Sequence, residues 1–314
     1  MNITKRRMFP ALLTILLFAT LLAGCAGKQS DAGQNDASQK EITCAADLEG
    51  ARIGVQLGTT GDIYVSDYEG DEAGTKIERY NKGADAIQAL KLGKIDCVVI
   101  DEQPGLQFVK QNSNIRIIDE EFTLEDYAFC VAKENTELLD NINGALEKLK
   151  ADGTIDSIVK NYIGTEEEVG QYPYVSKEVE RNNGTLIIGT NAEFPPYEYY
   201  DNNQVTGIDI DIMRAISDEL GMDIQVEDMA FDSIIAAITS GKVNVGASGF
   251  TVTEERKKNI NFTDTYITTK QVIIVKGDND TQKASIGEKF YDNFIKDSRY
   301  MYIVKGLGLS LIHI

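Results

Sequence analysis

The chain has 314 residues, 42% of them hydrophobic, which is enough for one large domain or two smaller ones. Its formal net charge of −19 argues against nucleic acid as a partner, because phosphate binding needs clustered lysine and arginine. The single histidine, His313, excludes Ser-His-Asp and Cys-His catalysis and two-histidine zinc sites, so we expect no metal or other cofactor. Catalysis by carboxylates alone is the enzymatic mechanism that remains.

The first 25 residues have the pattern of a secretory signal. Basic residues at 5–7 precede an apolar run over 8–23, and the sequence Leu-Ala-Gly-Cys at 22–25 follows. This ending is similar to the lipobox of bacterial lipoproteins, which implies a lipid anchor on Cys25 and a location on the extracytoplasmic face of the cell membrane. An uncut signal anchor, or an ordinary signal with a chance cysteine, are the alternatives. The polar residues 26–43 predict a flexible tether.

Three further cysteines, Cys44, Cys97 and Cys130, show no metal-ligand spacing. Cys97 and Cys130 lie in apolar, strand-like runs, which predicts buried thiols. A disulfide between these two remains open, because it requires their strands to be neighbours.

Residues 44–164 alternate between strand-like and helical patterns, which predicts an open α/β sheet. Residues 95–100 form a nearly continuous apolar run, typical of a strand covered on both faces. Strands are predicted at 52–57, 76–80, 95–100 and 115–118, a helix opening at the turn 58–61, and helices at 84–92, 104–111, 136–152 and 155–162. A polar connector follows over 165–183.

The alternation restarts over residues 184–276, which predicts a second α/β unit of similar size. Strands are expected at 186–190, 224–228, 243–247 and 270–276, and helices at 209–220 and 231–240. Two α/β lobes imply a cleft between them, which is the usual place for a small ligand.

Several local sequences resemble the bacterial extracellular solute-binding proteins of family 3, which bind amino acids for ABC importers. The stretches similar to the family's first lobe are 190–198 (TNAEFPPYE), 207–211 (GIDID), 248–256 (SGFTVTEER) and 262–266 (FTDTY). Those similar to its second lobe and closing helices are 53–61 (IGVQLGTTG), 95–101 (IDCVVID) and 151–154 (ADGT). The resemblance implies a two-lobed α/β fold of the periplasmic-binding-protein type (type II). It also implies a binding protein rather than an enzyme, with an ABC permease, separate or fused, and its ATPase as partners.

The order of these motifs is the reverse of the family's, because the second-lobe motifs and closing helices (44–164) precede the first-lobe motifs (184–276). A circular permutation is the simplest explanation, with the connector 165–183 joining the closing helices to the next strand. Both new ends, near Thr43 and Lys276, are then expected at the hinge. The alternative is a pair of half-modules, each needing a partner chain.

A free amino acid carries a carboxylate and an ammonium, and a site that excludes water must neutralise both. Arg256 can donate two parallel hydrogen bonds to the carboxylate, while Asp101, at the end of an apolar strand, is placed for the ammonium. The resemblance gives Asp101 the same role and implies that an aromatic pair contacts the ligand's side chain, where a buried Glu193 would favour a polar or cationic group. The expected ligand-binding residues are Thr59, Thr60, Asp101, Asn191, Glu193, Phe194, Phe231, Ser248, Gly249, Thr251 and Arg256.

Each of the central residues has a structural alternative. Arg256 lies in a Glu-Glu-Arg-Lys-Lys run, which is typical of a solvated helix face. Asp101 could cap the helix near Pro104. Phe194 and Phe231 could simply be core residues.

Residues 277–314 resemble the segment that leads into the first membrane helix of an amino-acid ABC permease. We expect a truncated receptor–permease fusion, and a short amphipathic tail is the alternative. Two other functions remain open. A dehydratase on the same fold would use Glu193 as the acid over its substrate, and a sensor input module would require a signalling domain.

Overall fold

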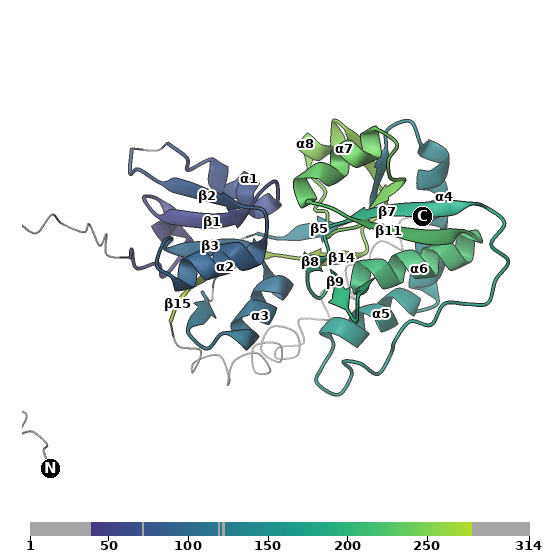
Figure 1. Cartoon of the computed structure of the whole chain (residues 1–314), viewed down its shortest axis with the longest axis horizontal. Helices are drawn as coiled ribbons and strands as arrows, with labels where there is room; N and C mark the ends of the chain where they lie inside the picture. The colour runs from purple at the N-terminus through teal and green to yellow at the C-terminus, as the bar shows by residue number, and fades with distance from the viewer. Residues whose placement is uncertain (1–38, 71, 119, 121–122, 278–314) are drawn as a thin grey trace, which may run out of the picture. The chain divides into compact units, whose positions relative to one another are not determined.

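The computed structural model describes residues 39–70, 72–118, 120 and 123–277. The expected signal sequence, most of the tether, the lipidation site Cys25 and nearly all of the tail lie outside the described residues. The described chain forms two mixed α/β lobes, each built on a five-stranded sheet (Figure 1). We call them the first and second lobes, as in the family described above.

The sheet of the second lobe has the strand order β2-β1-β3-β15-β4. β1 pairs in parallel with β2 and β3, while β15 runs antiparallel to both β3 and β4. The elements of this lobe are η1 (Ala45–Leu48), β1 (Arg52–Gln56), α1 (Thr60–Ser66), β2 (Lys76–Tyr80), α2 (Gly83–Lys91), β3 (Cys97–Asp101), α3 (Glu102–Gln111), β4 (Ile115–Ile117) and β15 (Gln271–Lys276).

Strand β3 shows why an apolar run without alternation forms a central strand. Cys97 and Val99 pack into one core cluster, whereas Val98 and Ile100 pack into another, together with Leu90 of α2. Both faces of the strand are therefore covered, as the sequence predicts, and each buried aliphatic side chain contributes about 1.5–3 kcal/mol to stability.

Strand β15 brings the far end of the described chain into the second lobe. Its register runs from Gln271 opposite Asp101 to Val275 opposite Cys97, so β15 lies beside β3 over the full length of that strand. Near the first of the described residues, the backbone N–H of Lys40 donates to Asp96, beside Cys97. The expectation that both ends lie at the hinge is therefore wrong. They lie at the opposite end of the sheet, because the apolar residues of β15 continue pairing for a full strand.

The sheet of the first lobe has the order β11-β7-β12-β6-β13, with β6 antiparallel to β12 and β13. Helices α5 and α6 cover one side and α7 lies on the other (Figure 1). Its elements are β5 (Glu125–Tyr127), β6 (Cys130–Ala132), α4 (Thr136–Ala151), α5 (Thr154–Ile163), β7 (Thr185–Thr190), β8 (Glu193–Phe194), β9 (Glu198–Asp201), β10 (Gln204–Thr206), α6 (Ile208–Leu220), β11 (Asp223–Asp228), η2 (Phe231–Ser233), α7 (Ile234–Thr239), β12 (Val245–Gly246), α8 (Glu254–Lys257), β13 (Ile260–Phe262) and β14 (Ile267–Thr269).

The predicted strands and helices are present, with ends shifted by at most two residues, except that the helix expected at 231–240 divides into η2 and α7. Sequence reasoning missed the small sheet β10-β9-β8. Its β9–β10 turn places Asn202 and Asn203 at φ 48° and 64°, the left-handed conformation that a two-residue hairpin turn requires. The described cysteines are free, and Cys97 and Cys130 are buried in different sheets.

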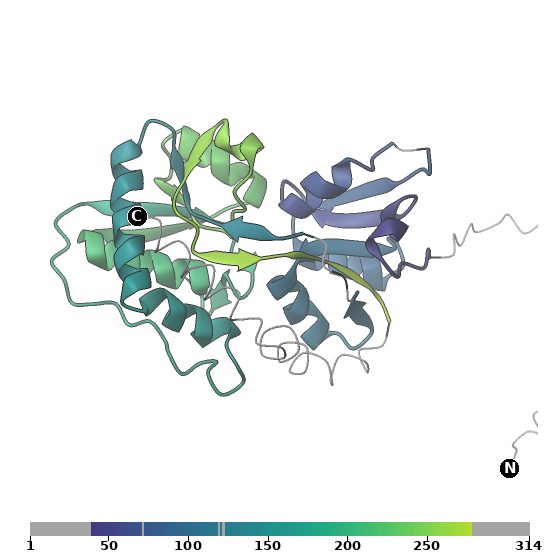
Figure 2. The same ribbon diagram turned by 180° about the vertical axis from the view of Figure 1, so that it is seen from behind.

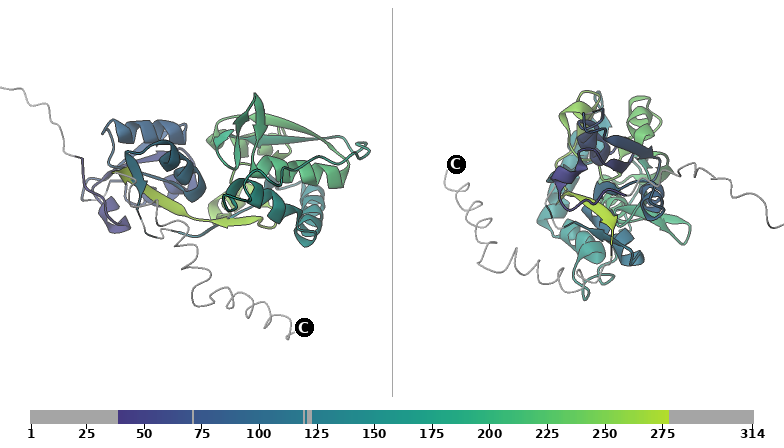
Figure 3. Two further views of the ribbon diagram at one scale, coloured as in Figure 1. Left: turned by 90° about the horizontal axis from the view of Figure 1, so that it is seen from below. Right: turned by 90° about the vertical axis from the view of Figure 1, so that its left-hand side faces the viewer.

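The chain passes between the lobes twice, from β4 into β5 and from β14 into β15. Strands β5 and β14 pair antiparallel and lie side by side when seen from behind (Figure 2). The yellow-green ribbon of β14 and β15 can be followed from one sheet to the other in Figure 3. Among the described helices, none has the length and apolar character needed to cross a membrane.

The connector 165–183 packs on the first lobe through interactions with the carboxylate of Asp218 in α6. The hydroxyl of Tyr174 and the backbone N–H of Lys177 each donate to Asp218 at 2.7 Å, and Arg181 forms an ion pair with it. The connector thus links α5 to β7 without leaving the first lobe.

Candidate functional site

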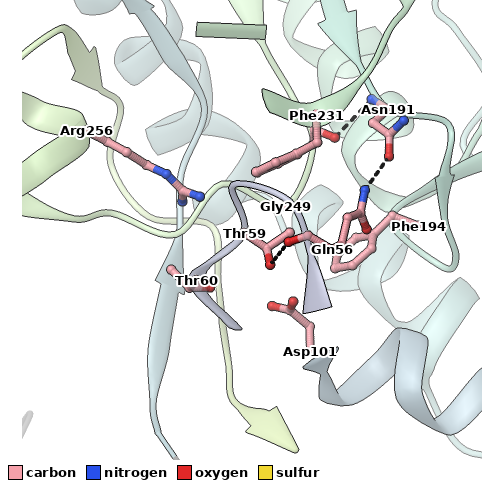
Figure 4. Close-up of a pocket in the computed structure, with 10 residues that line it drawn as sticks. Gln56, Thr59, Thr60, Asp101, Asn191, Phe194, Phe231, Gly249 and Arg256 are labelled. Atoms are coloured by element: carbon pink, nitrogen blue, oxygen red, sulfur yellow. Dashed lines mark hydrogen bonds between the residues drawn. The ribbon is translucent and has the colours of Figure 1, made fainter. Parts of the chain in front are cut away.

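A small pocket lies where strand ends from both lobes meet. Figure 4 shows side chains from both lobes pointing into it. Its lining residues are Gln56, Thr59, Thr60, Asp101, Asn191, Phe194, Phe231, Ser248, Gly249 and Arg256. Nine of these ten are residues expected from the sequence, and Gln56 is the exception.

Arg256 is buried in the pocket wall although it lies in a strongly charged run. Its side chain is only 6% exposed, so the solvated-helix alternative is wrong. The guanidinium carbon lies 5.4 Å from the ring centre of Phe231 and 5.3 Å from that of Phe250, which suits cation–π attraction. Its Nη1 donates to the carbonyl of Thr251 at 2.8 Å and its Nη2 to that of Gly58 at 3.0 Å. These bonds use two of five N–H donors, and the cation can therefore still receive a carboxylate.

Asp101 is a buried carboxylate and the last residue of β3. It occupies the N-cap position of α3, but its side chain makes no capping hydrogen bond, so the capping alternative is wrong. The Tyr127 hydroxyl donates to it instead. Burial, and then the nearby Glu125, raise the pKa of Asp101 to about 7, and the Tyr127 hydrogen bond opposes this rise. A ligand ammonium would favour the ionised form, because it would supply the opposite charge.

Glu125 is a site residue that sequence reasoning missed. Its Oε2 accepts hydrogen bonds from the hydroxyl of Thr60 at 2.9 Å, from that of Thr251 at 2.6 Å and from the Gln271 amide at 3.2 Å. Thr60 and Gln271 belong to the second lobe, whereas Thr251 lies beside β5, where it forms a bridge with Tyr127. The carboxylate therefore joins polar groups of both lobes behind the pocket. No local motif marks this residue, because its partners are distant in the sequence.

Gln56, the other missed residue, connects the two walls of the pocket. Its amide donates to the Asn191 side-chain oxygen at 2.9 Å. The backbone N–H of Asn191 in turn donates to the Ser248 hydroxyl at 3.0 Å, and Ser248 donates to buried Glu198 at 2.9 Å. Gln56 could have been noticed as a polar residue that ends β1 directly after the apolar residues 53–55.

The Gly249 loop is held by Asp209, at the start of α6. The N–H of Gly249 donates to one carboxylate oxygen at 2.8 Å, and the Tyr266 hydroxyl donates to the other at 2.7 Å. Gly249 has φ 53°, and an added Cβ would lie 3.0 Å from the rings of Phe194 and Tyr127. Glycine is therefore required here by both backbone conformation and space.

Three of the expected residues, Thr59, Thr251 and Glu193, make contacts that the sequence did not predict. Thr59 is the N-cap of α1, where its hydroxyl accepts from the N–H of Asp62 at 3.4 Å. Thr251 contributes its hydroxyl to Glu125 and its carbonyl to Arg256 rather than lining the pocket. Glu193 is partly exposed rather than buried and does not line the pocket itself, because its side chain forms an ion pair with Lys82 of the other lobe; its neighbour Phe194 is a lining residue.

Comparison with known families matches residues 69–165 and 186–302 to the model described as "Bacterial extracellular solute-binding proteins, family 3". These segments cover more than half of the chain. The chain belongs to this family. The members that it resembles are amino-acid-binding extracellular proteins, and two lobes are the family's fold.

Individual relatives match over shorter regions. The arginine-binding extracellular protein ArtP of Bacillus subtilis is 39% identical over 31% of this chain and 38% of its own length. The arginine-binding protein ArgT of Corynebacterium glutamicum is 37% identical over 26% and 27%, and the L-cystine-binding protein TcyJ of Escherichia coli is 27% identical over 40% and 46%. The matches thus span less than half of each relative.

Solved structures also match in part. An ancestral arginine-binding protein bound to arginine is 47% identical over 27% of this chain and 38% of that chain, with a TM-score of 0.26. The arginine-bound form of domain 1 from TmArgBP is 36% identical over 32% of this chain and 84% of that chain, with a TM-score of 0.27.

Proposed function

We propose that this protein binds a free amino acid outside the cytoplasm for delivery to an ABC importer. The observation that carries the proposal is one pocket lined by a buried cation, Arg256, and a buried carboxylate, Asp101. No ion pair of the described residues involves either side chain. An amino-acid head group supplies both missing counter-charges in one molecule.

Ligand binding stabilises the closed arrangement of the lobes in this proposal. Arg256 of the first lobe already donates to the Gly58 carbonyl of the second, and Gln56 donates to Asn191 across the pocket. A ligand that contacts both walls lowers the free energy of the closed form alone. It therefore shifts the population toward that form.

A cationic amino acid fits the charges of the site best. Two basic side chains lie in or beside the pocket, those of Arg256 and Lys82. Three acidic side chains lie there as well, those of Asp101, Glu125 and Glu193. The head group is neutral overall, so a positively charged ligand side chain balances the remaining negative charge. Two of the relatives named above are arginine-binding proteins, which supports the same class.

A thermal-shift screen of the twenty amino acids, followed by calorimetry, tests the proposal. We expect one-to-one binding that is strongest for arginine or another cationic amino acid. If a folded, monomeric chain binds none of the twenty, the proposed function is wrong.

We further propose that the chain is a circular permutant anchored by a lipid on Cys25. Support for the permutation comes from β15, which completes the second lobe's sheet, and from the closeness of Lys40 and Val275 to the segment at 96–97. A monomer that binds one ligand supports one cleft in a single chain, whereas ligand-dependent dimers would support two half-modules. Mass spectrometry of the membrane-bound protein tests the anchor, because Cys25→Ser must abolish the lipid adduct.

A further inference from the structure

An ion pair between Lys82 and Glu193 joins the two lobes beside the pocket. Lys82 precedes α2 in the second lobe, and Glu193 begins β8 in the first lobe, next to Phe194 in the pocket wall. The side chains are 48% and 35% exposed, so either can move into solvent without leaving a buried charge unpaired.

Local structure does not account for a lysine at position 82. It is the N-cap residue of α2, a position that favours Ser, Thr, Asp or Asn, and its side chain makes no capping hydrogen bond. The positive end of the helix dipole also disfavours a cation there. The charges that do attract Lys82 lie mainly in the first lobe. Its pKa is raised first by the hydrogen bond and charge of Glu193, with smaller contributions from Asp85 and Asp228.

The first lobe holds Asp228 and the backbone of Glu193 in fixed positions. Asp228 accepts from the backbone N–H of Ala192 at 3.0 Å and from the Tyr200 hydroxyl at 3.1 Å. Glu193 follows Ala192 directly, in a strand paired with β9. Lys82 therefore approaches a preformed anionic edge beside the part of the pocket where we expect the ligand's side chain.

We propose that Lys82 is a specificity-determining residue. Its ammonium binds Glu193 at the position that the cationic side-chain group of a ligand would otherwise occupy. This inference rests on the proposed function. A cationic ligand must displace Lys82 from Glu193 and also meets its positive charge, whereas a neutral ligand of the same shape does neither. Lys82 thereby weakens the preference of the site for cationic over neutral ligands.

The size of the effect follows from the exposure of the pair. Exposed ion pairs contribute about 0.2–1 kcal/mol, which corresponds to a change in affinity of at most about fivefold. Salt screens such pairs, so the effect shrinks as ionic strength rises above about 0.15 M. Any other contribution of Lys82 to closure that persists with both ligands bound changes both affinities equally and cancels in their ratio.

The test is calorimetric titration of the wild type and of Lys82→Met with L-arginine and with L-citrulline, its neutral analogue of nearly the same shape. The control is Lys110→Met, which removes the same charge from an exposed position in the last turn of α3. We expect Lys82→Met to raise the ratio of arginine to citrulline affinity by about two- to fivefold at low salt. The gain should shrink at 0.5 M salt, and Lys110→Met should leave the ratio unchanged.

Equal changes for both ligands would mean that Lys82 only stabilises closure, and the inference would be overturned. A lower ratio, or a gain that Lys110→Met reproduces, would overturn it as well. If the wild type binds no amino acid, it is the proposed function that fails. Both failures are thus distinguishable in one set of titrations.

Discussion

The sharpest prediction concerns the protonation of Asp101. The residue is 3% exposed, and burial raises its pKa to about 7 in the unliganded protein. A bound ammonium favours the ionised form and lowers this pKa, so binding below pH 7 must release a proton. The affinity for the ligand is therefore highest well above pH 7 and falls as the pH drops through 7.

The magnitude follows from the fraction of Asp101 that is ionised. One pH unit below the pKa about one-tenth of the carboxyl groups are ionised, so the apparent Kd at pH 6 should be about tenfold higher than at pH 8. At pH 5 the increase should be about a hundredfold. Asp101→Asn should bind more weakly at pH 8 and show little of this dependence.

Calorimetry between pH 5 and 8.5, in buffers with different ionisation enthalpies, measures both the affinity and the number of protons released. Asp209→Asn is the matched control, because the pKa of Asp209 is also raised by burial to about 7, yet its side chain holds the Gly249 loop and does not line the pocket. This control should keep the pH dependence. A wild-type affinity that stays constant between pH 8 and 6, or a slope that survives in Asp101→Asn, would refute the role of Asp101.

Three further predictions concern the site, its acids and the fold. Arg256→Ala should weaken binding by about 2–5 kcal/mol while circular dichroism shows an intact fold, and an unchanged Kd would contradict the site assignment. The stability of the unliganded protein should fall as the pH rises from about 4 to about 7, because the pKa of Asp101 is higher in the folded than in the unfolded protein. The resulting stabilisation is fully present below the unfolded pKa and is lost above pH 7. Urea titrations of the wild type and of Asp101→Asn should therefore differ in this window. Gly207→Ala should lower the free energy of unfolding by at least about 2 kcal/mol, because φ is 130° and the new Cβ would lie 2.1 Å from the Tyr197 carbonyl oxygen. Gly144→Ala, in open space on α4, should instead stabilise by about 0.5–1 kcal/mol, and equal effects of the two changes would contradict the packing described.

Local sequence patterns were sufficient for most elements and for much of the pocket. The apolar run that ends in Asp101 predicts a central strand with a carboxylate at its end, and the structure has both. The adjacent residues Asn202 and Asn203 are typical of a two-residue hairpin turn, and sequence reasoning missed this turn. Its neighbour Glu193 was found only through the family resemblance.

Other features depend on contacts between distant residues, which no local pattern encodes. β15 inserts between β3 and β4 because its apolar residues match both strands, and this placed the end of the described chain away from the hinge. Glu125 acquires its role from Thr60 and Thr251, which lie 65 and 126 residues away. Lys82 meets Glu193 only once the lobes have folded, across 111 residues of chain.

The central claim is that a single pocket neutralises the head group of a free amino acid. Calorimetric titration with L-arginine and with agmatine, which has the same guanidinium but no carboxylate, tests it most directly. We expect one arginine bound per chain and no measurable binding of agmatine, because Arg256 would have no carboxylate to pair with. Equal binding of both compounds, or no binding of arginine by the folded protein, would contradict it.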